Sequence, residues 1–228
     1  IMGTNPAVSM PEADGVVAAL KTCPFVVVSD VVETTETTAL ADVLLPAAAW
    51  GEKDGTVTNS ERRISRQRAF LPLPGVARPD WDIVADVARR MGFAGFDYAG
   101  PAAVFAEHAA LSGYENNGLR DFDISAHAQI DAAGYAGLAP FQWPQPAGRA
   151  AATTRFFGDG RFYTPDGKAR LTAPRPAARP VPDMASLRIN TGRIRDQWHT
   201  MTRSGKAPRL MGQFGEPFCD IHPQDAEK

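Results

Sequence analysis

The chain of 228 residues is long enough for one large domain or two modest ones. Its 24 Lys and Arg residues nearly balance its 26 Asp and Glu residues, and the formal charge of −2 excludes a generally basic protein that binds nucleic acid by counterion release. Two cysteines exclude a disulfide framework and a four-cysteine metal site, and no apolar run approaches the roughly 20 residues that cross a bilayer.

The first part of the sequence has the alternating pattern of an α/β protein. Residues 9–12 (Ser-Met-Pro-Glu) have the form of a capping box and predict a helix over residues 11–20. The run 25–29 (Phe-Val-Val-Val-Ser) is apolar and rich in β-branched residues, which predicts a buried parallel strand. A short helix over residues 34–41 and a second short strand over residues 42–45 complete this part.

Three more helices are predicted after a polar, glycine-containing stretch, residues 51–68, that predicts a structured loop. Asp80 caps the clearest helix and Gly92 ends it. Its apolar residues recur at helical spacing: Ile83, Val84, Val87, Ala88 and Met91. Residues 101–111 predict the second helix, with Gly113 just beyond it, and residues 125–133 predict the third.

Prolines mark the boundary between two parts of the chain. Eight of the 19 prolines fall in residues 140–182, which indicates a linker or a long excursion over a surface. Within this stretch, residues 161–172 predict a β-hairpin around the turn Pro165-Asp166-Gly167. A strand is predicted over residues 187–191. We therefore expect an α/β domain over residues 1–139, a proline-rich linker with a hairpin over 140–182, and a β-rich domain over 183–228.

The segment with the most unusual composition is residues 191–203, Thr-Gly-Arg-Ile-Arg-Asp-Gln-Trp-His-Thr-Met-Thr-Arg. Between residues 187 and 215 there are six Lys or Arg and one acid, a local charge of about +5 in a near-neutral chain. Arginine binds phosphate in a bidentate manner and Gly192 lets the backbone approach a ligand, so the segment suits an anionic ligand. A solvated basic loop is the alternative. The interleaved Trp198 and His199 weaken that alternative, because a solvated loop has no need of them.

Two further segments are candidates for ligand binding. Ser29 and Asp30 follow the buried strand, at the edge where ligands bind in open α/β sheets, and a carboxylate there can accept hydrogen bonds from a ribose or a guanine. The alternative is that Asp30 only caps the next turn, and the pattern alone favours this alternative. Residues 50–63 surround Lys53 with glycines and acids. Taken alone, they predict a surface loop.

Six segments in order carry a resemblance to a known family. They are residues 2–9 (MGTNPAVS), 28–30 (VSD), 41–46 (ADVLLP), 52–55 (EKDG), 59–63 (NSERR), and 191–193 with 196–202 (TGR and DQWHTMT). The series resembles the molybdopterin oxidoreductases that hold bis-molybdopterin guanine dinucleotide, and within them the bacterial assimilatory nitrate reductases. The resemblance covers nearly the whole chain, most loosely in residues 95–155.

The resemblance implies a fold and the location of the redox centres. The implied fold is part of a parallel-sheet, Rossmann-like α/β domain followed by the start of a β-barrel molybdopterin dinucleotide-binding domain. Cys23 and Cys219 match neither the four-cysteine iron–sulfur motif nor the molybdenum ligand of the family, so molybdenum and a [4Fe–4S] cluster are expected elsewhere. From its first and last residues, Ile-Met-Gly-Thr and Asp-Ala-Glu-Lys, we expect the carboxyl-terminal part of a catalytic subunit, inactive alone.

The resemblance also implies cofactor contacts, with no catalytic residue and no metal ligand in this chain. Ser29 and Asp30 match a strand-end pair at the guanine dinucleotide, and Lys53 and Asp80 match further polar contacts of that nucleotide. Residues 191–200 match the loop that wraps the pterin and its pyrophosphate. The expected cofactor-binding residues are Asn5, Ser29, Asp30, Lys53, Asp80, Thr191, Gly192, Arg193, Arg195, Gln197, Trp198, His199 and Thr200.

The expected activity is the reduction of nitrate to nitrite by a molybdenum enzyme of which this chain is a part. Electrons would come from ferredoxin, flavodoxin or an NAD(P)H-linked subunit, in the cytoplasm, with no nucleic acid and no membrane span involved. Formate dehydrogenase and periplasmic nitrate reductase are alternatives from the same superfamily. A scaffold homologue without pterin is the alternative from another class, and the retained nucleotide contacts argue against it.

Overall fold

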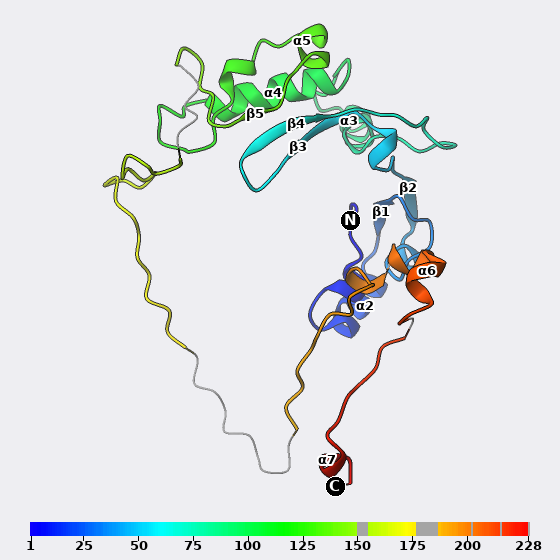
Figure 1. Cartoon of the computed structure of the whole chain (residues 1–228). Helices are drawn as coiled ribbons and strands as arrows, with labels where there is room; N and C mark the ends of the chain where they lie inside the picture. Colours follow the sequence, from blue (N-terminus) through cyan, green and yellow to red (C-terminus); the bar gives the residue numbers. More distant parts are fainter. Residues whose placement is uncertain (150–154, 177–186, 202, 215, 228) are drawn as a thin grey trace. The chain divides into compact units, whose positions relative to one another are not determined.

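A computed structural model of the chain describes residues 1–149, 155–176, 187–201, 203–214 and 216–227 (Figure 1). The chain folds into two compact units, which we describe separately. Unit 1 comprises residues 1–44 and 175–228, and unit 2 comprises residues 45–174. The first and last parts of the sequence therefore share one unit, although the sequence predicts separate domains for them.

Unit 1 is built around a short buried strand. Its amino-terminal part contains helices α1 (Pro6–Ser9) and α2 (Ala13–Thr22), strand β1 (Val27–Asp30) and the 3-10 turn η1 (Thr38–Leu40). Strand β2 (Val43–Pro46) pairs with β1 and continues into unit 2. Val28 of β1 and the preceding Val26 are buried, and the removal of their apolar side chains from water stabilises the fold.

The predicted elements of this part are confirmed in position but not in every detail. The helix starts two residues later than expected, and no capping box forms: Glu12 takes a left-handed conformation, and the Ser9 hydroxyl donates to the Asn5 carbonyl instead. The predicted strand shifts toward Asp30, and Phe25 is exposed. The predicted helix over residues 34–41 is only the single turn η1, since threonines satisfy its backbone.

The carboxyl-terminal part of unit 1 consists of short helical turns. They are η4 (His199–Met201), η5 (Ser204–Lys206), α6 (Pro208–Met211) and α7 (Pro223–Ala226). The strand predicted over residues 187–191 is wrong, and the described residues from 187 onward contain no strand. A strand needs a neighbouring strand for its backbone hydrogen bonds, and this part of the chain offers none.

Unit 2 contains an antiparallel sheet with the strand order β3-β4-β5. Strands β3 (Gly55–Thr58) and β4 (Arg63–Gln67) form a hairpin in register Thr58↔Ile64, and β5 (Phe141–Gln142) pairs Phe141 with Ile64. The expectation of a loop over residues 51–68 is therefore wrong. The linker expected over residues 140–182 also differs, because its first residues belong to this sheet.

The helices of unit 2 are η2 (Trp50–Glu52), α3 (Asp80–Arg90), α4 (Pro101–Gly113), η3 (Ser125–His127) and α5 (Ala132–Ala136). The helices predicted from Asp80 and over residues 101–111 are confirmed. The third predicted helix is two short turns, η3 and α5. Gly92, at φ +84°, follows α3 in the left-handed conformation expected of a residue that ends a helix.

One hydrophobic core holds the sheet of unit 2 against its helices. Phe105 and Ala109 of α4 pack with Ile124, with Tyr135 of α5, and with Ile64 and Phe141 of the sheet. Figure 1 shows α4 and α5 beside β4 and β5. The predicted hairpin over residues 161–172 forms only its turn: the Gly167 N–H donates to the Thr164 carbonyl at 2.9 Å, without flanking strands.

Candidate functional site

The turn that precedes α1 lies against the end of strand β1. Met2 and Ser29 form a parallel bridge, and the Gly3 N–H donates to the Ser29 carbonyl at 2.9 Å. Gly3 has a φ of +59°, a left-handed conformation that glycine adopts without steric cost. The structure thus brings together two of the segments singled out in the sequence, residues 2–5 and 28–30.

Ser29 and Asp30 differ in how their side chains are satisfied. Ser29 is 2% exposed, and its buried Oγ has no hydrogen-bond partner among the described residues. A buried hydroxyl without a partner is costly, so this atom suits a group that supplies a hydrogen bond. Asp30 accepts the Val32 N–H at 3.0 Å through Oδ1. This carboxylate therefore does cap the next turn, as its alternative interpretation predicts.

Asn5 is locked between two side chains of the loop that follows β1. The Asn5 amide donates to Glu36 Oε2 at 2.9 Å, and the Thr37 hydroxyl donates to Asn5 Oδ1 at 2.6 Å. The same Thr37 oxygen accepts the Ala7 N–H at 3.1 Å. The hydrogen bond from Asn5, helped by a backbone N–H, lowers the pKa of Glu36. Asn5 therefore orients the turn, a role that the sequence analysis did not assign.

A threonine cluster that was not predicted from the sequence holds this loop. The Thr35 N–H donates to Thr38 Oγ1 at 2.7 Å, and the Thr38 N–H donates to Thr35 Oγ1 at 3.0 Å. Thr35, Thr37 and Thr38 are all buried. The run Thr-Thr-Glu-Thr-Thr at residues 34–38 was the available signal, because short hydroxyl side chains compete for backbone groups and favour turns over helices.

Gln197 anchors the loop of residues 191–203 from within. Its Nε2 donates to the carbonyls of Leu210 at 3.3 Å and Phe214 at 3.1 Å, and its Oε1 accepts the Ser204 hydroxyl at 2.7 Å. Ser204 Oγ in turn accepts the Trp198 N–H at 2.9 Å. Gln197 is 8% exposed. Its side chain is thus used inside the protein, although the sequence analysis places it at the cofactor.

The neighbouring side chains of this loop are exposed. Thr191, Gly192, Arg193, Trp198 and His199 all face solvent, and the Trp198 and His199 rings meet edge to face at 4.7 Å. Such exposed donors are free to bind a ligand.

Arg195 differs from its neighbour Arg193, because an adjacent acid occupies its guanidinium. It forms a bidentate pair with Asp196, at 2.8 and 3.0 Å. This pair raises the pKa of Arg195 and lowers that of Asp196. Among the described residues Arg193 has no ion pair. Of the two arginines, Arg193 is therefore the freer one for an anion.

A shallow hollow of about 390 Å³ lies where the two polar segments of unit 1 meet. It is lined by Thr34, Thr35 and Glu36 from the loop after β1, and by Thr200 and Met201 from η4. Thr200 and Met201 have φ values of +52° and +60°, left-handed conformations that cost energy for residues with a Cβ. Such strain is typical of segments whose shape serves a ligand.

Lys53 and Asp80 form an ion pair within unit 2, with side chains 27% and 42% exposed. Asp80 is the first residue of α3, where the positive end of the helix dipole favours a carboxylate. No side-chain cap forms there, because the carboxylate faces Lys53. The two residues expected at one nucleotide are thus in contact with each other.

The part of the chain that the structure describes contains neither a cluster of metal ligands nor a helix fit to span a membrane. No three His, Cys, Asp or Glu side chains gather there as a metal site would require. Cys23 and Cys219 are free and exposed. No helix in the described ranges is both long and apolar enough to cross a bilayer.

Two family matches cover the segments that contain these residues. Residues 1–90 match the molybdopterin oxidoreductase family, and residues 187–228 match the molydopterin dinucleotide binding domain. The chain belongs to the molybdopterin oxidoreductases. Residues 1–44 and 187–228 of unit 1, and the Lys53–Asp80 pair of unit 2, fall inside these matches.

Curated relatives agree with this assignment over the whole chain. A nitrate reductase of Klebsiella oxytoca is 50% identical over 100% of this chain and 26% of its own length. The assimilatory nitrate reductase catalytic subunit of Bacillus subtilis is 34% identical over 99% of this chain and 31% of its own. The alpha subunit of an F420-dependent formate dehydrogenase of Methanocaldococcus jannaschii is 34% identical over 100% of this chain and 32% of its own length. The chain therefore spans about a quarter to a third of these relatives.

A solved structure shares the fold. Acetylene hydratase from Pelobacter acetylenicus matches with a TM-score of 0.50 at 19% identity, over 73% of this chain and 20% of that one. At this identity the match supports the mixed helix and sheet fold alone.

Residues 91–186 lie outside both family matches.

Proposed function

We propose that this chain holds the guanine dinucleotide and pterin of bis-molybdopterin guanine dinucleotide in an enzyme that reduces nitrate to nitrite. The observation that carries the proposal is the hollow in unit 1 where the loop after β1, whose Glu36 is bound by Asn5, meets η4. The 50% identity to a nitrate reductase supports the substrate.

The residues of the site fit such a cofactor. Ser29 Oγ is a buried hydroxyl that lacks a partner in the described structure, as expected where a polar group of a ligand approaches. Arg193 and His199 are exposed and can donate to the pyrophosphate and to the heteroatoms of the pterin. Unit 2 contains a separate candidate, in which Lys53 holds the Asp80 carboxylate in place, and such a carboxylate can accept from the N–H edge of a guanine.

The chemistry of the reaction would come from the cofactor, whose molybdenum supplies two-electron oxygen-atom transfer. The residues of this chain would bind and orient it and offset the charge of its diphosphates. A [4Fe–4S] cluster, an electron donor such as ferredoxin, flavodoxin or an NAD(P)H-linked subunit, and a cytoplasmic location complete the proposal for the longer subunit. The Rossmann-like parallel sheet and the dinucleotide-binding β-barrel are likewise proposed for that subunit.

The test changes Arg193 and His199 separately to Ala in the full-length subunit and measures bound pterin and nitrate reduction. We expect the pterin content to fall in both variants. Lys21→Ala, on the exposed face of α2, is the matched control and keeps its pterin. Undiminished pterin in both loop variants would contradict the role of this loop.

Formate oxidation is the second candidate, favoured by the F420-dependent formate dehydrogenase at 34% identity. Turnover of nitrate and of formate by the same purified subunit separates the two. Nitrate turnover alone supports the proposal, and formate turnover alone overturns it. A preparation that contains neither molybdenum nor pterin would favour a scaffold without a cofactor.

A further inference from the structure

A segment of unit 2 outside both family matches, residues 155–170, carries exposed cations. Together with Arg149 it contains five of them and two carboxylates, a net charge of +3. All five cationic side chains are exposed: Arg149, Arg155, Arg161, Lys168 and Arg170. Of these five, only Arg170 is in an ion pair within the described structure, with Asp166 at 3.4 Å. Four cations therefore remain available to a partner.

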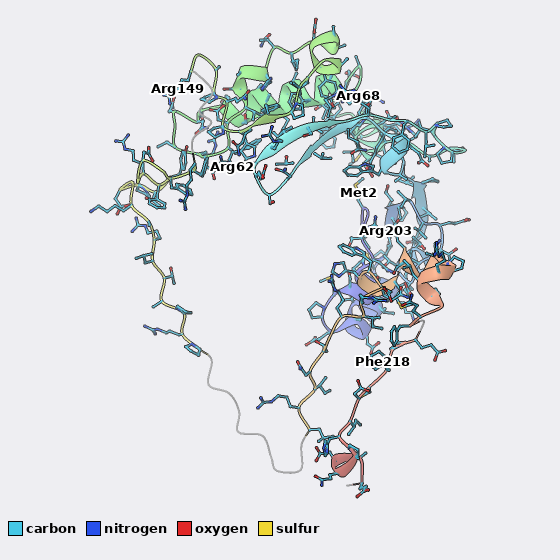
Figure 2. The ribbon with its side chains drawn as sticks, viewed as in Figure 1. Met2, Arg62, Arg68, Arg149, Arg203 and Phe218 are labelled. Atoms are coloured by element: carbon cyan, nitrogen blue, oxygen red, sulfur yellow. The ribbon has the colours of Figure 1, made fainter. Side chains whose placement is uncertain are left out.

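Aromatic contacts fix this segment to the rest of unit 2. The Phe156 ring meets the Trp143 ring edge to face at 5.6 Å, and the Arg62 guanidinium lies 4.0 Å from the centre of the Phe156 ring. Cation–π and aromatic contacts of this kind each contribute about 0.5–1.5 kcal/mol. Arg62 immediately precedes β4 and Arg149 lies in the loop after β5, and Figure 2 labels both on this part of unit 2.

Two aromatic side chains next to Phe156 are exposed to solvent: Phe157 is 42% exposed and Tyr163 is 45% exposed. The Phe157 ring stacks on the Phe162 ring, with 4.7 Å between their centres and an angle of 12° between their planes. Phe157 has a φ of +59°, a strained conformation for a bulky residue. Two turns hold it there, with the Gly158 N–H on the Arg155 carbonyl and the Gly160 N–H on that of Phe157, both at 3.0 Å. The strain presents an apolar ring to solvent.

Exposed aromatic rings surrounded by arginines are the composition of a protein-binding surface. The net positive charge selects an acidic partner, because complementary charge steers the encounter. Nucleic acid fits less well, since Phe157 and Phe162 stack on each other rather than offering separate faces to bases. The near-neutral charge of the whole chain also counts against nucleic acid.

We propose that Phe157, Tyr163 and the cations around them form a docking surface for an acidic redox protein that delivers electrons. This inference rests on the proposed function, because nitrate takes up two electrons and two protons to give nitrite and water, and those electrons must come from a donor. A surface outside the family matches leaves the cofactor-binding residues free.

The experiment compares Arg161→Glu and Phe157→Gly with the control Lys21→Glu in the full-length enzyme. Glycine suits the left-handed conformation at position 157, so this variant removes the ring and relieves the strain. Nitrate reduction is driven either by reduced methyl viologen, a small donor that needs no docking, or by a reduced acidic [2Fe–2S] ferredoxin. Binding of the ferredoxin is measured separately by calorimetry.

We expect Arg161→Glu to raise the KM for ferredoxin about tenfold at low ionic strength, with a smaller rise for Phe157→Gly and none for the control. The difference disappears near 0.5 M salt, where the Debye length is only about 4 Å. The rate with methyl viologen stays unchanged in all variants.

Three results would overturn the docking surface. They are unchanged ferredoxin kinetics and binding in both variants, an equal loss with both donors, and binding of duplex DNA in place of ferredoxin. An unmodified enzyme that fails to reduce nitrate with methyl viologen would instead contradict the proposed function. In that case the calorimetric measurement of ferredoxin binding, and its loss in Arg161→Glu, still tests the docking surface independently of activity.

Discussion

The two polar segments of unit 1, residues 29–38 and residues 191–203, are built in opposite ways. In the first, the side chains of Thr35, Thr37 and Thr38 are buried and paired, as in the Asn5–Thr37 and Thr35–Thr38 contacts. The second is held by one buried side chain, Gln197, and leaves Arg193, Trp198 and His199 exposed. A segment that is already ordered loses little conformational entropy when a ligand binds. An exposed loop supplies free donors but loses more conformational entropy on binding.

The largest effect on stability is expected from Thr37→Val, which keeps the shape of the side chain. It leaves the buried Ala7 N–H without its acceptor and removes the hydrogen bond to Asn5 Oδ1, at a cost of about 2–4 kcal/mol. Hydrogen exchange of the amides in residues 1–44 measures it. Thr58→Val, at the exposed end of β3, is the control. Equal exchange protection of residues 1–44 in the two variants would contradict the role of Thr37.

A smaller loss is expected from Gln197→Leu, which removes the anchor of the second segment. The carbonyls of Leu210 and Phe214 lose their partner, but both residues are partly exposed and water replaces part of the loss, so the cost is about 1–2 kcal/mol. Faster exchange confined to residues 196–214 is the expected result, with the exposed Gln224→Leu as the control. A loss as large as that of Thr37→Val would show that both segments are equally rigid.

Arg193→Ala and Arg195→Ala separate a free cation from a paired one. Because Asp196 already occupies the guanidinium of Arg195, only Arg193→Ala should weaken cofactor binding, by about tenfold, while neither changes stability by more than about 0.5 kcal/mol. Pterin retained after dialysis of the full-length subunit measures this. A larger loss in Arg195→Ala would contradict the role of the pair.

The smallest effect concerns the carboxylate that Asn5 holds. The pKa of Glu36 is lowered from its ordinary 4.5, so its contribution to stability is complete above that value and is lost as the pH falls through the lowered pKa. Asn5→Ala removes the donor and should move the pKa of Glu36 back up, as an NMR titration would show. Asn59→Ala, far along the sequence in a different turn, should leave it unchanged.

Local pattern was enough to locate β1 and α3. Val28 is buried in β1 as predicted, and the apolar spacing identifies α3, but of the five apolar residues used only Ile83 and Ala88 are buried, whereas Val84, Val87 and Met91 are exposed. Pattern was not enough for the hairpin β3–β4, whose residues are mostly polar. Its stability depends on Phe141, which lies 77 residues from Ile64 in the sequence but pairs with it, and on Arg66, whose guanidinium lies 3.7 Å from the centre of the Tyr135 ring.

The candidate site divides in the same way. The residue types of Ser29, Asp30, Arg193 and His199, and the order of their segments, could be interpreted from the sequence because they carry their own chemistry. The roles of Asn5, Glu36 and Gln197 could not, because each depends on a partner from another segment.

The sequence by itself determined the family, the positions of the helices and strands with strong apolar patterns, and the excess of cations near residue 195. The local conformation of residues 193–196 decided that Asp196 pairs with its neighbour Arg195 and not with Arg193. The tertiary structure decided that the first and last parts of the chain share one unit and that Thr37 joins Asn5 to the loop after β1. Hydrogen bonds and ion pairs act over about 3 Å, and only folding brings residues so far apart in sequence within that reach.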